Sequence, residues 1–202
     1  MPVDRAARAH KREQVRQRLM DAADALLEEH PWPEVTVELI TSRGGVSRTV
    51  FYQHFRDRQE LLLTLFDAVA ADLAHVGDGW MKGGEDPAAE HRRSLVGLTG
   101  LFERHGRLLQ AVNDAAVLDA DVAAAYGRLV DVIVDTTTEA IVRDVAHGAM
   151  QVVDAEQMSR ALSAMMERYL LRSFGRAPFP DPAVVAETLA TVWIRTLYTP
   201  GG

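Results

Sequence analysis

The polar side chains within residues 36–55 are the ones in this chain whose types and spacing best suit binding chemistry. Thr36 and Ser47 each precede a short helical pattern, where a hydroxyl can accept a hydrogen bond from a free backbone N–H and cap the helix. Gly44 and Gly45 predict the end of the first helix, because glycine adopts the left-handed conformation without a Cβ clash. We therefore expect two short helices joined by a tight turn.

A short helix, a glycine turn and a second short helix form the helix-turn-helix pattern. In that motif the second helix enters the major groove of DNA, and its N-terminal residues face the base edges. The second helix is expected from residue 48 to about residue 54. The chemistry that this stretch predicts is therefore hydrogen bonding to DNA.

The distribution of charge favours an N-terminal end that faces nucleic acid, although the formal net charge of the chain is −7. Residues 1–18 carry six basic and two acidic side chains, and residues 1–60 carry ten of each. The net negative charge therefore lies in residues 61–202, which would be repelled by phosphate. Residues 1–9 are expected to be a disordered basic arm, for which contact with DNA and a solvated tail are the two alternatives.

Other kinds of chemistry lack a signal in this sequence. There is no cysteine, which excludes disulfides, thiolate nucleophiles and cysteine zinc sites. The seven histidines form neither H-x-x-x-H nor H-E-x-x-H, and no glycine-rich phosphate loop or G-x-S-x-G is present. We therefore expect no enzyme activity, no metal and no cofactor, and we interpret Glu90 and His91 as a solvated pair.

The length and composition indicate a globular chain. At 202 residues and 48% hydrophobic residues, the chain can form one large or two modest domains with a proper core. No apolar run of about 18 residues is present, and the charged N-terminus lacks an apolar segment of the signal-peptide type. The expectation is a cytoplasmic protein with no membrane span.

Apolar residues recur every three or four positions along the chain, which predicts helices and no strand, and therefore an all-α fold. Asp57, with Glu60 three residues later, is expected to begin a long helix with a capping box. Residues 77–87, rich in glycine, are expected to be a linker, and Gly106 is expected to break a helix. The expected long helices and helical pieces span residues 10–30, 58–75, 85–105, 108–113, 121–146, 155–174 and 183–198.

The helix-turn-helix stretch resembles the DNA-binding domain of the TetR family of bacterial transcription regulators. The matching residues are Gly45-Val46-Ser47, Phe51-Tyr52, His54-Phe55, and Arg58 shortly before Glu60-Leu61. Arg58 stands where the family usually has lysine, and Val50 where a small hydroxyl residue is common. The C-terminal sequence is similar to that of the ethionamide-repressor branch of the family. The matching segments are A-L-x-x-M-x-E-R-Y-L-L-x-S-F and V-W-I-R-T-L-Y.

The resemblance implies a helix-turn-helix DNA-binding domain in residues 1–60, which is followed by a helical ligand-binding and dimerisation domain in residues 61–202. In this reading the N-terminal residues of the second helix face base edges, and the aromatic and histidine side chains that follow bind phosphate oxygens. The implied DNA contacts are Thr36, Ser47, Arg48, Thr49, Val50, Tyr52, Gln53, His54 and Arg58.

The resemblance also implies a homodimer through the last two helices, which would bind a palindromic double-stranded DNA operator. A small apolar effector would bind in a mostly apolar pocket, tilt the helix of residues 58–75 and release a repressor from its operator. Plain core packing is the alternative for each pocket candidate, and His105 and Asn113 are expected to be the polar ones. The candidates are Leu98, Leu101, Phe102, His105, Asn113, Tyr126, Val130, Ile133, Met165, Met166 and Trp193.

A second function class stays open at this point. The chain could be a helical ligand-binding dimer that has lost sequence-specific DNA binding. Val50, without the hydroxyl usual in the family, favours this alternative, whereas Arg48, Tyr52, His54 and the basic N-terminus disfavour it.

Overall fold

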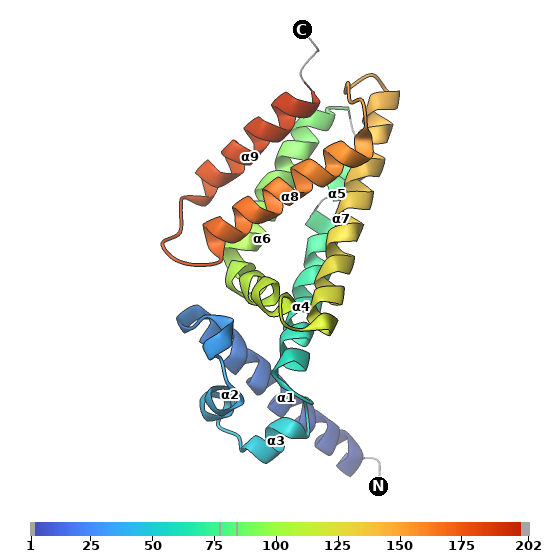
Figure 1. Cartoon of the computed structure of the whole chain (residues 1–202). Coiled ribbons are helices and arrows are strands. Elements are labelled where there is room, and N and C mark those ends of the chain that lie inside the picture. Colours follow the sequence, from blue (N-terminus) through green and yellow to red (C-terminus); the bar gives the residue numbers. More distant parts are fainter. Residues whose placement is uncertain (1–2, 77, 84, 199–202) are drawn as a thin grey trace.

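The computed structural model describes residues 3–76, 78–83 and 85–198, and within them it contains helices and no strand (Figure 1). The predicted all-α fold is therefore confirmed. The elements are α1 (Val3–Glu29), the 3₁₀ helix η1 (Trp32–Glu34), α2 (Val37–Gly44), α3 (Arg48–Tyr52), α4 (Arg58–Val76), α5 (Asp78–Lys82), α6 (Pro87–Ala116), α7 (Ala120–Ala146), α8 (Ala155–Phe174) and α9 (Pro182–Leu197).

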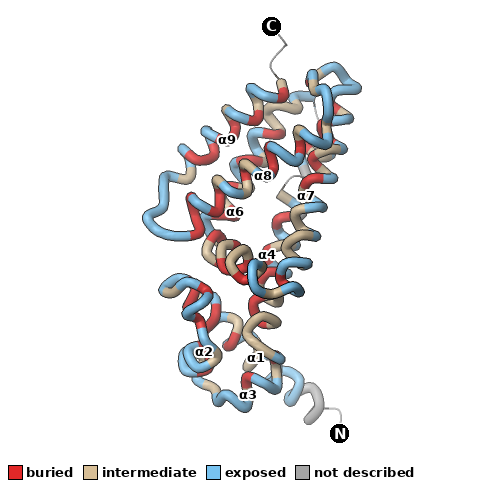
Figure 2. The backbone as a smooth tube through the Cα atoms, viewed as in Figure 1, coloured by how far each residue is buried: buried red, intermediate tan, exposed pale blue. Residues whose placement is uncertain are grey.

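The helices form a small head and a larger body. In Figure 1, α1, α2 and α3 make the head at the lower end, and α4 runs from the head into the body formed by α5 to α9. Buried apolar side chains continue from the head through α4 into the body (Figure 2). A rotation of α4 would therefore shift side chains in both the head and the body.

The expected caps of the helix-turn-helix are present in the structure. The Thr36 Oγ1 accepts a hydrogen bond from the Leu39 N–H at 3.3 Å, and the Ser47 Oγ accepts one from the Val50 N–H at 3.3 Å. Between the two helices Gly45 has a φ of 62°, in the left-handed region that glycine favours. Local hydrogen bonds thus set the ends of α2 and α3.

The N-terminal segment differs from the expected disordered arm of residues 1–9. Helix α1 begins at Val3, so residues 3–9 are helical, whereas residues 1–2 lie outside the described part of the chain. The segment that follows Pro2 contains alanine and arginine, which are good helix formers, and no helix breaker. The first helix therefore extends seven residues further toward the N-terminus than its apolar pattern indicates.

The expected linker at residues 77–87 contains the short helix α5, which packs into the body. The Trp80 side chain is only 3% exposed, and its Nε1 donates to the Tyr198 Oη at 3.0 Å and to the Asp144 Oδ2 at 3.3 Å. The linker prediction was wrong for α5, because these partners lie far away along the sequence. Residues 77 and 84 lie outside the described residues.

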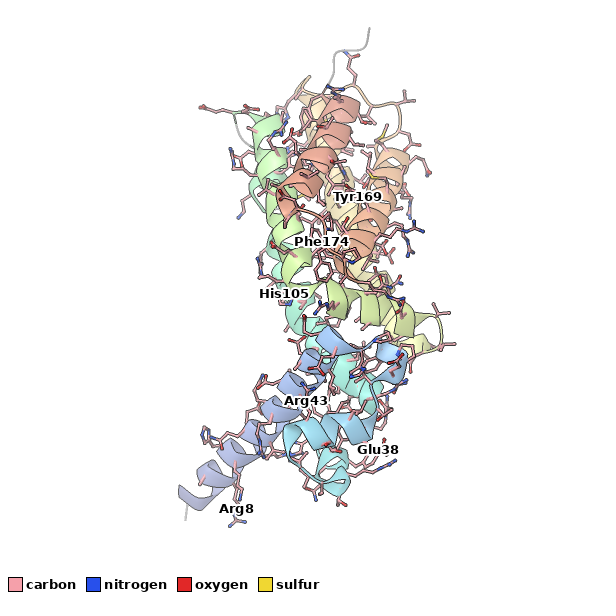
Figure 3. All side chains as sticks on the ribbon, turned by 90° about the vertical axis from the view of Figure 1, so that its left-hand side faces the viewer. Arg8, Glu38, Arg43, His105, Tyr169 and Phe174 are labelled. Carbon is pink, nitrogen blue, oxygen red and sulfur yellow. The ribbon has the colours of Figure 1, made fainter. Side chains whose placement is uncertain are left out.

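Helix α6 passes without interruption through Gly106, where the sequence predicts a break. The axis of the helix changes direction near His105, and Phe174 of α8 lies beside this bend (Figure 3). A Cβ on residue 106 would stand 2.6 Å from the Phe174 carbonyl oxygen. Gly106 therefore allows close approach of α8 and does not end the helix.

Candidate DNA-binding surface and ligand cavity

Helix α3 presents a polar side to solvent and anchors itself through Phe51. Phe51 is fully buried and packs against Phe55, with the ring centroids 5.8 Å apart. Six of the nine predicted DNA contacts are exposed: Thr36, Ser47, Arg48, Thr49, Tyr52 and Gln53. The other three, Val50, His54 and Arg58, are partly buried.

Arg48 lies at the start of α3 and contacts one side chain of α2 and one of α3. It forms an ion pair with Glu38 of α2, and its Nη2 donates to the Tyr52 Oη at 3.3 Å. Both side chains of the ion pair are 60% exposed. An exposed pair of this kind contributes at most about 1 kcal/mol, so DNA could replace Glu38 as the partner of Arg48 at low cost.

Two arginines of α1 hold the C-terminal end of α3, a role that sequence reasoning missed. The Arg12 Nη2 donates to the Gln53 carbonyl oxygen at 3.4 Å, and the Arg16 Nη1 donates to the His54 carbonyl oxygen at 3.3 Å. The Arg16 guanidinium also lies over the Phe55 ring, 4.4 Å from its centroid. The i, i+4 spacing of the two arginines is the signal that could have indicated a shared face.

His54 lies beside this basic group, and its environment favours the neutral imidazole. Burial lowers the pKa of His54, and the positive charges of Arg12 and Arg16 lower it further, whereas Glu13 opposes them. A neutral imidazole can still donate one hydrogen bond to a phosphate oxygen. The positive charge near this end of α3 therefore comes from the arginines of α1.

The Arg58 guanidinium points into the head. Its Nη1 donates to the Val35 carbonyl oxygen at 2.6 Å and to the Trp32 carbonyl oxygen at 3.0 Å, and the group lies 4.7 Å from the Trp32 ring centroid. Burial lowers the pKa of Arg58. In this arrangement Arg58 ties α4 to η1, and its predicted phosphate contact would require the side chain to leave these partners.

A cavity of about 260 Å³ lies in the body and is lined by residues of α4 to α9. Its walls are mostly apolar, as expected for a pocket that accepts an apolar molecule. Seven of the eleven predicted pocket residues line it: Leu98, Phe102, Tyr126, Val130, Ile133, Met166 and Trp193.

Four of the predicted pocket residues do not line this cavity. Leu101 is 1% exposed and belongs to the core, whereas His105, Asn113 and Met165 are partly buried elsewhere. Figure 3 shows His105 at the bend of α6. Apolar periodicity identifies the buried side of a helix but not which neighbour that side meets, which is why these four were misplaced.

The polar residues of the cavity are different from the expected His105 and Asn113. Trp80, His91, Ser163 and Glu167 line the cavity, and sequence reasoning missed all four. His91 was expected to be solvated, but it is only 2% exposed. The only sequence signal for a buried His91 was its position after the first turn of an amphipathic helix, and this signal is weak.

Part of the cavity wall is built from aromatic rings in contact with one another. The His91 imidazole lies parallel to the Trp80 indole, with centroids 3.8 Å apart and an interplanar angle of 6°, and it meets the Trp193 ring edge to face at 5.0 Å. Burial lowers the pKa of His91 to about 3, so the imidazole is neutral at physiological pH.

A second polar pair lines the cavity on α7 and α8. The Tyr126 Oη donates to the Glu167 Oε1 at 2.5 Å, and the Tyr126 ring lies 6.1 Å from that of Phe66 in α4. Burial raises the pKa of Tyr126, and the hydrogen bond to Glu167 raises it further. The tyrosine therefore stays protonated and links the cavity wall to the helix that enters the head.

The described residues offer neither a metal site nor a membrane-spanning helix. They contain no group of three histidine or acidic side chains that could hold a metal ion. None of the helices in the described part of the chain is long and apolar enough to cross a membrane.

Comparison with known families matches both parts of the chain. Residues 19–65 match the model described as "Bacterial regulatory proteins, tetR family", and residues 91–199 match "Transcriptional regulator EthR, C-terminal domain". The chain belongs to the TetR family of transcriptional regulators. Members of this family bind DNA and act as dimers with small-molecule effectors, and they are not enzymes.

This regulator is similar over most of its length to a mycobacterial protein. The HTH-type transcriptional regulator EthR of Mycobacterium tuberculosis (strain ATCC 25618 / H37Rv) is 29% identical over 189 residues, which make up 89% of this chain and 85% of that protein.

Solved structures of other regulators show the same fold. NalD, the secondary repressor of the MexAB-OprM multidrug efflux pump in Pseudomonas aeruginosa, superposes with a TM-score of 0.72 at 19% identity, covering 95% of this chain and all of that one. SmeT, the repressor of the Stenotrophomonas maltophilia multidrug efflux pump SmeDEF, gives 0.71 at 18% identity, covering 92% and 91%. At these identities the similarity concerns the fold alone.

Proposed function

We propose that this regulator is a repressor that binds a palindromic operator as a homodimer and is released by a small apolar effector in the body cavity. The single observation that carries the proposal is that α4 contacts the DNA-binding head and also lines the cavity. It packs against the head that carries α3, and its Leu73 and Val76 line the cavity. A ligand that reshapes the cavity would therefore move the head.

The proposed DNA contacts lie on the exposed side of α3 and at the starts of α2 and α3. Arg48 and Thr49 would face base edges, where arginine paired with guanine contributes about 1–3 kcal/mol of discrimination. Tyr52 and His54 would bind phosphate and fix the register. Because its partner would be chromosomal DNA, we place the regulator in the cytoplasm.

The proposed dimer interface uses the outer faces of α8 and α9. Val184 and Val192 of α9 are 60% and 39% exposed, and Ala161 and Ala164 of α8 are exposed small residues that allow close packing. Figure 2 shows exposed residues along α9. Two heads related by a two-fold axis would read half-sites about 34–36 Å apart or a multiple of that distance.

Two ion pairs connect the head to the body, and they would transmit a change in the shape of the cavity to the head. Glu28 of α1 pairs with Arg107 of α6, and Arg56, before α4, lies 3.8 Å from the Asp121 carboxylate of α7. An effector shifts the equilibrium between two head spacings only by its difference in affinity for them. The cavity would therefore have to change shape between the two spacings.

The proposal is tested by selecting random duplex DNA with the purified protein, followed by affinity measurements at several salt concentrations. We expect an enriched palindrome whose binding is lost in Arg48→Ala and retained in Arg93→Ala, which removes an equal charge from an exposed position of α6 in the body. A steep salt dependence without an enriched sequence would mean phosphate binding only and would contradict the proposal.

The second candidate is a ligand-binding dimer without sequence-specific DNA binding. Val50 favours it, because this partly buried side chain provides no hydroxyl for phosphate. Under this alternative the same selection would yield no DNA binding at moderate salt, whereas cavity ligands would still bind.

A further inference from the structure

Three residues that line the cavity each carry a buried polar atom with no hydrogen-bond partner among the described residues. The three atoms are the His91 Nδ1 of α6, the Ser163 Oγ of α8 and the Trp193 Nε1 of α9. We propose that these atoms form a polar subsite that binds an uncharged hydrogen-bonding group, such as the carbonyl of an amide, ester or ketone, on an otherwise apolar effector. The inference rests on the proposed function of the cavity as an effector site.

The burial of the three residues makes their unpaired atoms unusual. His91, Ser163 and Trp193 are 2%, 6% and 1% exposed, and all three line the same cavity although they belong to different helices. Most buried polar side-chain atoms in proteins have a partner, and an unpaired one carries a desolvation penalty. The residues that carry these three atoms line one apolar cavity, so a ligand that reaches the atoms from the cavity would supply the missing partners.

Neighbouring residues of the same types are satisfied within the protein. Ser159, one turn before Ser163 on α8, donates through its Oγ to the Val134 carbonyl oxygen at 2.9 Å. Trp80, which stacks on His91, donates through its Nε1 to Tyr198. The fold therefore provides partners for a serine and an indole nearby, but not for Ser163 and Trp193.

The chemistry of the three groups defines the class of ligand. The Trp193 N–H can only donate, so it requires an acceptor on the ligand, and the Ser163 hydroxyl can either donate or accept. His91 is a neutral imidazole and offers no positive charge to a carboxylate. The Asp144 carboxylate near His91 is paired with Arg143, whereas Glu167 lines the cavity itself and would repel an anion. An uncharged carbonyl satisfies the donors without burying a charge.

The binding experiment uses three probes with the same number of non-hydrogen atoms: 4-phenylbutanamide, 4-phenylbutanoate and hexylbenzene. Dissociation constants are measured by equilibrium dialysis against the full-length protein and the double variant Ser163→Ala/Trp193→Phe. Each lost hydrogen bond is expected to weaken the amide about twofold to tenfold, and both together up to about a hundredfold. Hexylbenzene binding should change less than about twofold, and the carboxylate should bind the wild-type protein more weakly than the amide.

The matched control is Met166→Leu, which changes the cavity wall without removing a polar atom and should affect the amide and hexylbenzene equally. If the double variant weakens the amide no more than hexylbenzene, the polar subsite is wrong, while the cavity remains a ligand site. If the wild-type protein binds none of the three probes, the effector site itself is overturned and the inference with it.

A stability measurement tests the inference without any ligand. Ser163→Ala should leave the urea midpoint of unfolding unchanged or raise it, because its hydroxyl has no partner to lose. Ser159→Ala, on the same helix, should lower the midpoint, because Val134 loses a buried donor. An equal fall for both variants would mean that the Ser163 hydroxyl is already satisfied, and would overturn its assignment to the subsite.

Discussion

Gly106 of α6 lies so close to Phe174 of α8 that a Cβ on residue 106 would stand 2.6 Å from the Phe174 carbonyl oxygen and 2.7 Å from its carbonyl carbon. Those backbone atoms cannot turn aside as a flexible side chain could. The contact sets how closely α8 approaches α6, and both helices line the cavity. The glycine therefore helps to set the shape of the cavity wall.

Gly106→Ala is expected to destabilise the protein. Alanine would gain about 1 kcal/mol of helix propensity over glycine, but overpacking against Phe174 typically costs about 1–3 kcal/mol. Urea unfolding should therefore show a net loss of stability. In Gly100→Ala, on the same helix, the Cβ would meet only the Arg104 guanidinium at 3.6 Å, so this variant should be stabilised. Stabilisation of both variants would contradict the tight contact.

Glu38→Gln is expected to strengthen DNA binding. The change frees Arg48 from its ion pair and removes a negative charge near the phosphates. Because an exposed ion pair contributes at most about 1 kcal/mol, the affinity for DNA should rise by up to about fivefold. Fluorescence anisotropy with the selected operator measures the affinity. Glu139→Gln, an equal charge change at an exposed position of α7, is the control. Weaker binding by Glu38→Gln would show that Glu38 holds Arg48 in position to contact a base.

Arg58→Ala is expected to lower stability by about 1–2 kcal/mol, because the carbonyl oxygens of Trp32 and Val35 lose their shared donor. Chemical unfolding measures this change, and Arg56→Ala, whose guanidinium is exposed, should shift the midpoint much less. The salt dependence of operator binding gives a second measurement. A slope reduced by about one unit would show that Arg58 reaches a phosphate in the complex.

His91 is expected to make stability depend on pH below neutrality. Its pKa is about 3 in the folded protein and takes the ordinary value near 6.5 when unfolded. Between these values the unfolded chain binds a proton that the folded chain does not, so stability falls as the pH drops below about 6.5, by up to about 1.4 kcal/mol per pH unit.

The measurement for His91 is urea unfolding between about pH 7.5 and 4.5 for the wild-type protein and His91→Phe, which keeps a ring beside Trp80. The rings of Trp80, Trp193 and Tyr198 face the imidazole, and the nearby carboxylate of Asp144, with its partner Arg143, is present in both proteins. The wild-type protein should lose more stability than the variant over this range. Parallel losses would show that His91 is protonated in the folded state.

The features that could be predicted from the sequence are those that depend on neighbouring residues. The caps by Thr36 and Ser47 and the left-handed Gly45 each involve partners within four positions. Asp154 likewise accepts a hydrogen bond from the Gln157 N–H at 3.0 Å and begins α8 where expected. Helix boundaries around these residues were therefore close to those of the structure.

The features that could not be predicted depend on contacts between distant segments. The glycine-rich segment around Trp80 became a helix because Asp144 and Tyr198 receive its N–H, and Gly106 stayed helical because Phe174 lies against it. The Arg58 guanidinium donates to the Trp32 carbonyl oxygen of η1, a contact that the sequence does not indicate. In each case the deciding partner is more than twenty residues away, so no local pattern indicates it.

The amino-acid sequence by itself determined the all-α fold, the helix-turn-helix and the apolar character of the body, because these follow from short-range hydrogen bonds and from the helical repeat of apolar residues. Only the tertiary structure decided which side chains face the cavity. Met166 lines it and Met165 does not, although they are adjacent in the chain. His91 became a buried, neutral member of its wall because Trp80 and Trp193 enclose it, and such an enclosure exists only after α5, α6 and α9 have packed together.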